Sequence, residues 1–192
     1  MKLAPVLSIA LLACAAGVVL AKQPSPSQHV PAGTLPAPTE YREWIFLSSG
    51  IDMSYASSKE ASSHQFDNVF VNPEAYRSFL KTGVWPNGTN LVLEFRGADH
   101  PTSINQRGHV QSGAATGHEI HVKYNGTWAF YDWPADAPNA TLIERPASCY
   151  TCHETHGAAD TTFVQFYPTL LPVAQQKHTL TEAFLKELSA AK

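Results

Sequence analysis

Charged residues, methionine and cysteine are all scarce in this 192-residue sequence. Only 15% of the residues are charged, and 13 Lys and Arg stand against 16 Asp and Glu without forming a basic patch. Nucleic acids and anionic membrane surfaces attract clustered positive charge, so the composition argues against both as partners. No internal repeat is present. The hydrophobic content of 44% is enough for one globular domain with a core of its own.

The N-terminus has the order of a secretory signal peptide. Lys2 precedes an apolar run over residues 3–20, and Ala21 offers a small residue at the cleavage point. We predict a cleaved signal over residues 1–21 and a periplasmic protein. A membrane anchor is one alternative, and a lipoprotein attached through Cys14 is another. Cleavage would leave 12 Lys and Arg against 16 Asp and Glu, a formal charge of −4.

Residues 22–40 differ in composition from the rest of the chain. They hold five of the fourteen prolines, with Ser, Thr and Gly between them. Such a composition is typical of a flexible tether. We therefore expect the ordered domain to occupy residues 41–192.

The predicted domain contains both strands and helices. Five segments have the aromatic, β-branched or alternating composition of strands, namely 42–49, 64–71, 91–96, 118–124 and 127–133. The first of them could also be a short helix that runs into a strand. Asn125 and Gly126 predict a hairpin turn between the last two. Three segments favour helices, namely 74–81, 163–170 and 181–191. The pattern predicts an α+β domain with an antiparallel sheet as its core and flanking helices.

Local signals refine these boundaries. Asn72 and Pro73 predict the start of the first helix as N-cap and first helical residue, and Gly83 predicts its end. Residues 97–117 are rich in Gly and Ser, so we expect mostly loop there. The strand at 118–124 alternates between two faces. One face carries His118, Ile120, Val122 and Tyr124, and the other carries Glu119, His121 and Lys123.

Loss of Cys14 with the signal would leave only Cys149 and Cys152 in the mature chain. They stand in the run Cys149-Tyr150-Thr151-Cys152-His153, which is the attachment signature of a c-type haem. Each sulfur adds to one vinyl group of the porphyrin, and the adjacent imidazole becomes the proximal iron ligand. The sequence therefore predicts one covalent haem, bound through Cys149, Cys152 and His153.

Other chemistries can use parts of this motif. A redox dithiol has the same spacing but normally opens a helix in a βαβ unit, which the pattern does not show. A zinc site could add His156, although adjacent Cys152 and His153 can hardly reach one metal. A disulfide between Cys149 and Cys152 would close a small, strained loop. Covalent haem remains the favoured interpretation.

The sixth coordination position of such a haem is open to several residues. Met53 is the only methionine of the mature chain and a conceivable axial ligand. Other conceivable ligands are His64, His100, His109, His118 and His121. Each alone is more often a core or surface residue, so we expect an open or weakly capped distal side. An open iron binds small ligands, whereas a closed one mainly carries electrons.

Six blocks of the sequence follow one another in a recognisable order, namely Tyr41-Arg42-Glu43-Trp44, Asn72-Pro73-Glu74-Ala75-Tyr76, Lys81-Thr82-Gly83, Gly88-Thr89, Trp128-Ala129-Phe130-Tyr131 and the segment 149–170. In this order they resemble the cytochrome P-460 family, which includes the cytochromes c′-beta. The resemblance implies a β-rich α+β domain, a homodimer and a five-coordinate c-type haem late in the chain. It places the haem motif on Cys149, Cys152 and His153.

One position departs from the hydroxylamine-oxidising members that this sequence resembles. Those members carry a lysine cross-linked to the porphyrin, and counting from Gly88 and Thr89 places Leu93 at that position. Leucine cannot form the bond, and Lys123 belongs to another block. The c′-beta type is therefore the better analogue, with Leu93 and Phe70 or Phe95 crowding the iron. Such an apolar pocket admits nitric oxide and carbon monoxide but lacks donors for dioxygen.

Three functions remain as hypotheses. The first is an exported mono-haem cytochrome that binds a small gaseous or nitrogenous ligand such as nitric oxide, exchanges electrons with a soluble partner, or does both. The second is an oxidoreductase acting on hydroxylamine or peroxide, which needs an acid–base group such as Glu119, Glu144, Arg96 or a histidine. The third is a plain six-coordinate electron-transfer cytochrome with a protein ligand such as Met53.

Overall fold

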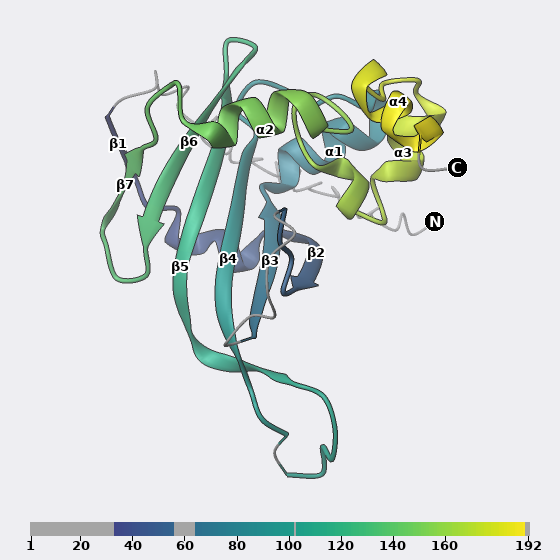
Figure 1. Cartoon of the computed structure of the whole chain (residues 1–192). Helices are drawn as coiled ribbons and strands as arrows, with labels where there is room; N and C mark the ends of the chain where they lie inside the picture. Colours follow the sequence, from purple (N-terminus) through teal and green to yellow (C-terminus); the bar gives the residue numbers. More distant parts are fainter. Residues whose placement is uncertain (1–32, 56–63, 102, 191–192) are drawn as a thin grey trace, which may run out of the picture.

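A seven-stranded sheet is the centre of the computed structural model, which describes residues 33–55, 64–101 and 103–190 (Figure 1). Every pairing between neighbouring strands is antiparallel. In spatial order the strands are β1 (Thr34–Pro36), β7 (Asn139–Leu142), β6 (Thr127–Pro134), β5 (Val110–Tyr124), β4 (Asn90–Asp99), β3 (Gln65–Val71) and β2 (Ile45–Ile51). The predicted antiparallel core is confirmed.

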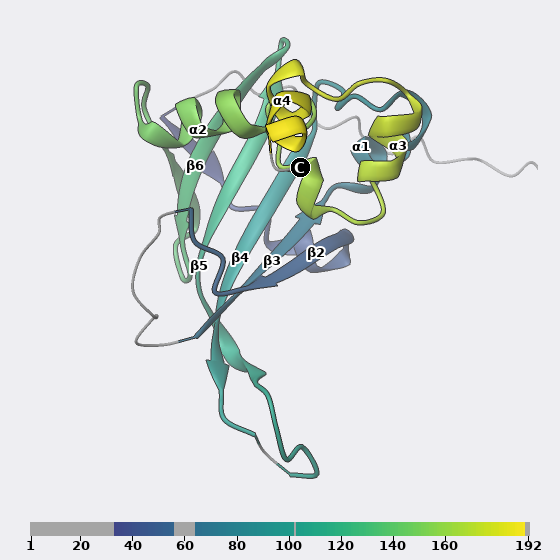
Figure 2. The ribbon, with the colours of Figure 1, turned by 45° about the vertical axis from the view of Figure 1, so that its right-hand side comes forward.

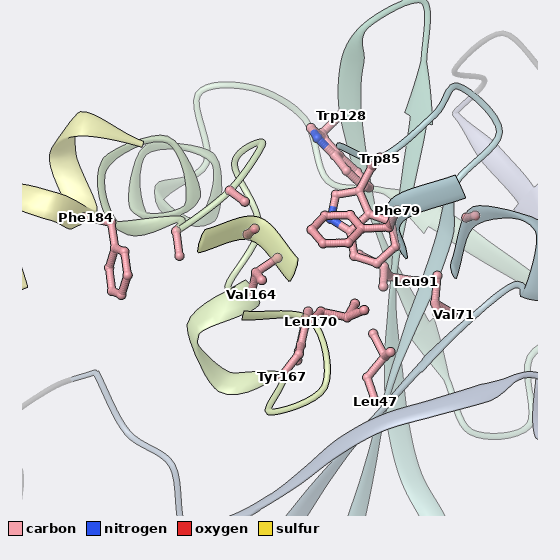
Figure 3. Close-up of a cluster of buried hydrophobic side chains, with 14 of the residues drawn as sticks. Leu47, Val71, Phe79, Trp85, Leu91, Trp128, Val164, Tyr167, Leu170 and Phe184 are labelled. Carbon is pink, nitrogen blue, oxygen red and sulfur yellow. The ribbon is translucent and has the colours of Figure 1, made fainter. Parts of the chain in front are cut away.

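The α-helices cover one face of this sheet. They are α1 (Pro73–Thr82), α2 (Ser148–His156), α3 (Leu171–Gln176) and α4 (Glu182–Ala190), and two 3-10 turns, η1 (Thr39–Glu43) and η2 (Val164–Phe166), accompany them. Figure 2 shows the helices gathered on one side of the sheet. Each α-helix contributes buried side chains to one cluster with the sheet. In that cluster the rings of Phe79 and Trp85 pack 4.3 Å apart (Figure 3). The mixed class predicted from the sequence, a sheet with flanking helices, is therefore confirmed.

The strands send alternate side chains to two separate cores. We call the covered side the helix-side face; on β4 it receives Leu91 and Leu93, the first of which joins the cluster with the helices. The opposite face receives Val92 and Glu94, and Tyr41 of η1 joins the second cluster with Val92 there. Because successive side chains of a strand point to opposite faces, β4 serves both cores at once.

The first helix begins and ends as predicted, but its N-cap works differently. The Asn72 side chain makes no hydrogen bond to the first turn of α1. Its Oδ1 instead accepts a bond from the Asn90 backbone N–H at 2.8 Å, so it ties the helix start to β4. Gly83 ends the helix with φ of +74°, and an added Cβ there would lie 2.6 Å from Thr179 Oγ1. Both conditions favour glycine.

Residues 97–117 contain more strand than the sequence predicted, because residues 97–99 and 110–117 belong to β4 and β5. β4 continues to Asp99 and β5 begins at Val110, with Ala98 opposite Gln111, so the pair projects from the sheet as an arm (Figure 1). Register shifts on either side of Arg96 mark its base. Gly and Ser are depleted in buried strands because they pack poorly, but an exposed two-stranded ribbon needs little packing.

The tether was predicted to extend too far. Residues 34–36, assigned to it from their composition, form β1 and pair with β7 at the edge of the sheet. An edge strand tolerates proline at a position where the backbone nitrogen points away from the neighbouring strand, because the missing N–H then costs no hydrogen bond within the sheet. The proposed signal peptide and the rest of the tether, residues 1–32, lie outside the described residues, as does Cys14. Within the described ranges no helix has the length and apolarity to cross a membrane.

The helix expected over residues 163–170 is replaced by two shorter elements. Residues 164–166 form η2, and Tyr167 then adopts an extended conformation with φ of −106° and ψ of 93°. The residue before a proline avoids the helical region, so Pro168 accounts for this break. Helix α3 starts only at Leu171, with Pro172 in its first turn.

A buried carboxylate organises the opposite face of the sheet. Glu94 is 1% exposed and accepts bonds from Arg96 Nε at 2.7 Å, Arg42 Nη2 at 2.5 Å and Asn68 Nδ2 at 3.0 Å. The Tyr41 hydroxyl donates to it as well. Burial alone would raise the pKa of Glu94, but the bonds from Arg96, Tyr41 and Asn68 and the charge of Arg42 lower it to about 2.

Stability at acid pH tests this network. Since the pKa of Glu94 is lower in the folded state than its ordinary 4.5, its contribution is complete above pH 4.5 and is lost as pH falls toward 2. This contribution is on the order of 3 kcal/mol. Glu94→Gln should therefore lower the free energy of unfolding at pH 6 and remove this acid-dependent loss. Urea unfolding at pH 6 and pH 3 measures both, and an equal acid loss in the two proteins would refute the assignment.

Candidate functional site

A cavity of about 460 Å³ lies between the helix-side face of the sheet and the segment from α2 to Tyr167. Its volume is in the range of small-molecule and cofactor sites. The sheet supplies mainly apolar side chains, and the other wall adds aromatic rings. The lining includes Val69, Leu91, Leu93, Phe95, Glu119, His121, Cys149, Cys152, His153, Phe163, Phe166 and Tyr167, with Met53 and Tyr55 from the segment after β2.

Helix α2 brings the three motif residues to this cavity. Cys149 and Cys152 are three residues apart and His153 follows at i+4 from Cys149, so a helix places all three along one side. Both sulfurs are free thiols and partly exposed. His153 is 9% exposed and is packed between rings, with the Phe163 ring stacked 4.1 Å away and the Phe130 ring at 4.7 Å.

A hydrogen bond fixes the orientation and tautomer of His153. Its Nδ1 lies 2.9 Å from the backbone carbonyl oxygen of Thr161. A carbonyl can only accept, so Nδ1 carries the proton and Nε2 keeps a free lone pair. Burial, and then the neighbouring His121, lower the pKa of His153 to about 4. The imidazole is therefore neutral near pH 7, which is the form that binds a metal.

Among the histidines considered from the sequence, the structure brings His121 to the cavity. Its ring lies 4.9 Å from that of His153, and its Nε2 is 3.6 Å from Glu119 Oε2. The His121 imidazole lowers the pKa of Glu119. The predicted alternation of this strand is thus correct, and Glu119 and His121 of its polar side line the cavity.

The other candidate histidines have other surroundings. His118 is buried on the opposite face, with its ring stacked 4.0 Å from that of Trp133. The rings of His64 and His109 lie 4.4 Å apart, and His64 also pairs with Asp52. His100 is exposed.

The remaining candidates divide between the two faces. Leu93, Phe95 and Met53 line the cavity, as does Glu119. The expectation for Phe70 was wrong, because it lies on the opposite face with its ring 5.4 Å from that of Tyr41.

Two proposed acid–base groups lie elsewhere. Arg96 donates to Glu94 on the opposite face. Glu144 is not among the residues described as lining the cavity.

Two important groups escaped the sequence analysis. Asp67 of β3 lines the cavity, and burial raises the pKa of its carboxyl. Strand alternation could have placed it, since Val69 on the same face also lines the cavity. The Thr161 carbonyl had no such signal, because any residue carries a backbone carbonyl.

The alternatives to haem at the motif find little support. Among the residues with described positions, no group of three or more His, Cys, Asp or Glu side chains could hold a metal ion. His156, the fourth possible zinc ligand, pairs with Glu187 of α4. A thioredoxin-like dithiol would need a βαβ unit, and the sheet is antiparallel.

The comparison with protein families decides the assignment. The sequence model of the family described as cytochrome P460 matches residues 38–164. The chain belongs to the cytochrome P460 family. The matched span runs from the residue before η1 to the first residue of η2, so it contains α2 and most of the cavity wall. A search of curated proteins finds no match to the chain.

Membership in the cytochrome P460 family implies a haem cofactor, and the cavity residues fit one. Two free thiols and a histidine with an available Nε2 border the same apolar space. When bound, a haem supplies an iron that can bind a small ligand or change oxidation state. The protein orients the imidazole, keeps it neutral and surrounds it with aromatic rings that exclude water.

The two thiols can be tested separately. Cys149→Ala or Cys152→Ala should leave haem attached through one thioether and lower the yield, and the double variant should hold no covalent haem. Denaturing gels stained for haem and acid–acetone extraction measure attachment. Ser148→Ala, a change at a neighbouring lining residue, is the control and should retain the haem. Complete extraction of haem from the unaltered protein would contradict covalent attachment.

Proposed function

We propose that this cytochrome P460 protein is exported and carries one c-type haem, attached through Cys149 and Cys152 with His153 as proximal ligand, and that it binds nitric oxide or a similar small molecule. The observation that carries the proposal is the hydrogen bond from His153 Nδ1 to Thr161, because it leaves Nε2 free for iron. The lone pair belongs to a residue of an apolar cavity that both motif thiols border.

The composition of the cavity supports an open coordination position. The sheet wall is formed in large part by Val69, Leu91, Leu93 and Phe95, which have no side-chain donor or iron ligand. His121 contacts both Glu119 and the His153 ring, so it already has partners. A mainly apolar space accepts diatomic ligands such as nitric oxide and carbon monoxide but gives little hydrogen-bond support to bound dioxygen.

Leu93 weakens the case for hydroxylamine oxidation. It lines the cavity at the position where the sequence comparison expects a cross-linking lysine, and it lies opposite Glu119 in the β4–β5 register. A leucine side chain has no nitrogen with which to attack the porphyrin. Glu119 and Asp67 nevertheless place carboxyl groups at the cavity, so oxidoreductase chemistry with an acid–base group is a second candidate.

Met53 supports a third candidate, a six-coordinate electron-transfer cytochrome. It lines the cavity and is 38% exposed, and a thioether is a known axial ligand of haem. We rank this candidate lower because Met53 lies on a segment outside the sheet and helices.

The cellular setting is part of the proposal. The order of Lys2, the apolar run and Ala21 supports export to the periplasm, where covalent haem attachment is compatible with an oxidising compartment. A soluble redox partner would supply or accept electrons. The resemblance to the family supports a homodimer.

Optical spectra of the reduced protein separate the three candidates. We expect a five-coordinate, high-spin ferrous haem whose spectrum changes on addition of carbon monoxide or nitric oxide, and Met53→Ala should have the same spectrum. A six-coordinate, low-spin haem that ignores carbon monoxide, and becomes high-spin in Met53→Ala, would favour the electron-transfer candidate. Turnover of hydroxylamine or peroxide above that of free haem, lost in Glu119→Gln, would favour the oxidoreductase.

A further inference from the structure

The turn that meets His153 has an unusual backbone. Asp160 and Thr161 have φ of +50° and +55°, and the Thr162 N–H donates to the Ala159 carbonyl at 2.9 Å. Two consecutive residues with positive φ closed by this bond are typical of a type I′ turn, which favours Asn and Gly. The hairpin at Asn125 and Gly126 follows that preference.

The residues of the Asp160–Thr161 turn are poorly suited to its conformation. Aspartate tolerates a left-handed backbone moderately well, but a β-branched threonine does so poorly. Such a strained position persists only where surrounding contacts enforce it, and it often serves a functional site. The Thr161 carbonyl is the group that this turn presents to His153 Nδ1.

A buried ion pair enforces the turn. Lys123 Nζ lies 2.5 Å from Asp160 Oδ2 and 2.8 Å from the Trp85 carbonyl oxygen, and the Lys123 side chain is 9% exposed. The Trp85 N–H donates to the same Asp160 oxygen at 3.2 Å. The Asp160 carboxylate is therefore held from two directions by β5 and the segment after α1.

Further contacts fix the two ends of the turn. The Trp85 indole Nε1–H donates to Thr162 Oγ1 at 2.8 Å. At the other end, an added Cβ on Gly157 would lie 2.6 Å from the His153 carbonyl oxygen and 2.7 Å from the Thr161 carbonyl carbon. Glycine thus allows the turn to approach the end of α2 closely, and the ion pair keeps it there.

We propose that Lys123 is a positioning residue for the proximal histidine. Through Asp160 it holds the strained turn whose Thr161 carbonyl accepts the hydrogen bond from His153 Nδ1. The inference rests on the proposed function, in which His153 Nε2 binds the haem iron. It assigns a role to a lysine that does not border the haem cavity.

The hydrogen bond has a defined effect on the iron. A carbonyl acceptor at Nδ1 makes the imidazole a stronger donor at Nε2, which strengthens the iron–histidine bond and favours the oxidised iron. If Lys123 were absent, the turn would relax and the bond would weaken. The reduction potential would then rise, and the iron–histidine stretching frequency would fall.

Simple electrostatics predicts the opposite change in potential. Replacing Lys123 by methionine removes a positive charge and leaves Asp160 unpaired, and both changes stabilise the oxidised, more positive iron. A merely electrostatic role therefore lowers the potential. A positioning role raises it, so the sign of the shift separates the two.

A suppressor variant sharpens the test. Thr161→Gly keeps the backbone carbonyl and removes the cost of the positive φ, so the turn should hold without the ion pair. Lys123→Met should shift the potential upward and the stretching frequency downward. Lys123→Met with Thr161→Gly should restore the frequency and lower the potential again, because the turn is held but the lysine charge is still absent. Potentiometry and resonance Raman spectra of the ferrous holoprotein measure them. Glu94→Gln, which destabilises the opposite face, is the control and should leave the stretching frequency unchanged.

The outcomes are distinct. A downward or absent shift of the potential in Lys123→Met, or a double variant whose stretching frequency is not restored, overturns the positioning role while leaving the haem assignment intact. If Lys123→Met fails to assemble, the stretching frequency of the double variant decides: an unaltered frequency supports the inference, and a lowered frequency opposes it. A protein without any iron–histidine band overturns the proposed function itself.

Discussion

The alternation of side chains along β4 and β5 is the constraint on which both sides of this molecule depend. On β4, Leu91 and Leu93 face the cavity, whereas the buried carboxylate of Glu94 lies on the other side with its arginines. On β5, His121 and Lys123 point to the helix side, and Ile120 points away. A shift of one residue in register would exchange apolar wall and charged network. The sheet therefore separates the apolar wall of the cavity from the charged network around Glu94.

The site is assembled from groups far apart in the sequence. Helix α2 supplies thiols and imidazole on one side, and the sheet supplies an apolar wall. The connection between them is made by the turn at Asp160 and Thr161, which contacts His153, Trp85 and Lys123. The geometry of the imidazole thus depends on β5 and the segment after α1 as well as on its own helix. These contacts explain why so short a helix can hold the His153 imidazole in one orientation.

The sequence was most informative where chemistry depends on side-chain identity or strict alternation. The motif residues and Leu93 line one cavity, and Glu119 and His121 from the polar side of the strand at 118–124 line it too. The expectation for Phe70 failed because each face of β3 carries both apolar and polar residues, so composition could not decide which face meets the cavity. The role of the Thr161 carbonyl could not be predicted, because its position depends on a strained turn. That turn is held by the ion pair between Asp160 and Lys123, which lie 37 residues apart in the sequence.

The arm formed by the ends of β4 and β5 has consequences for how this protein can be altered. Beyond Arg96 its strands pair with each other, outside both buried clusters, and Ile104 near its tip is 93% exposed. Added residues there would lengthen a ribbon without displacing a core side chain. The tip is thus a natural point at which to attach a fluorophore or to tether the protein to an electrode.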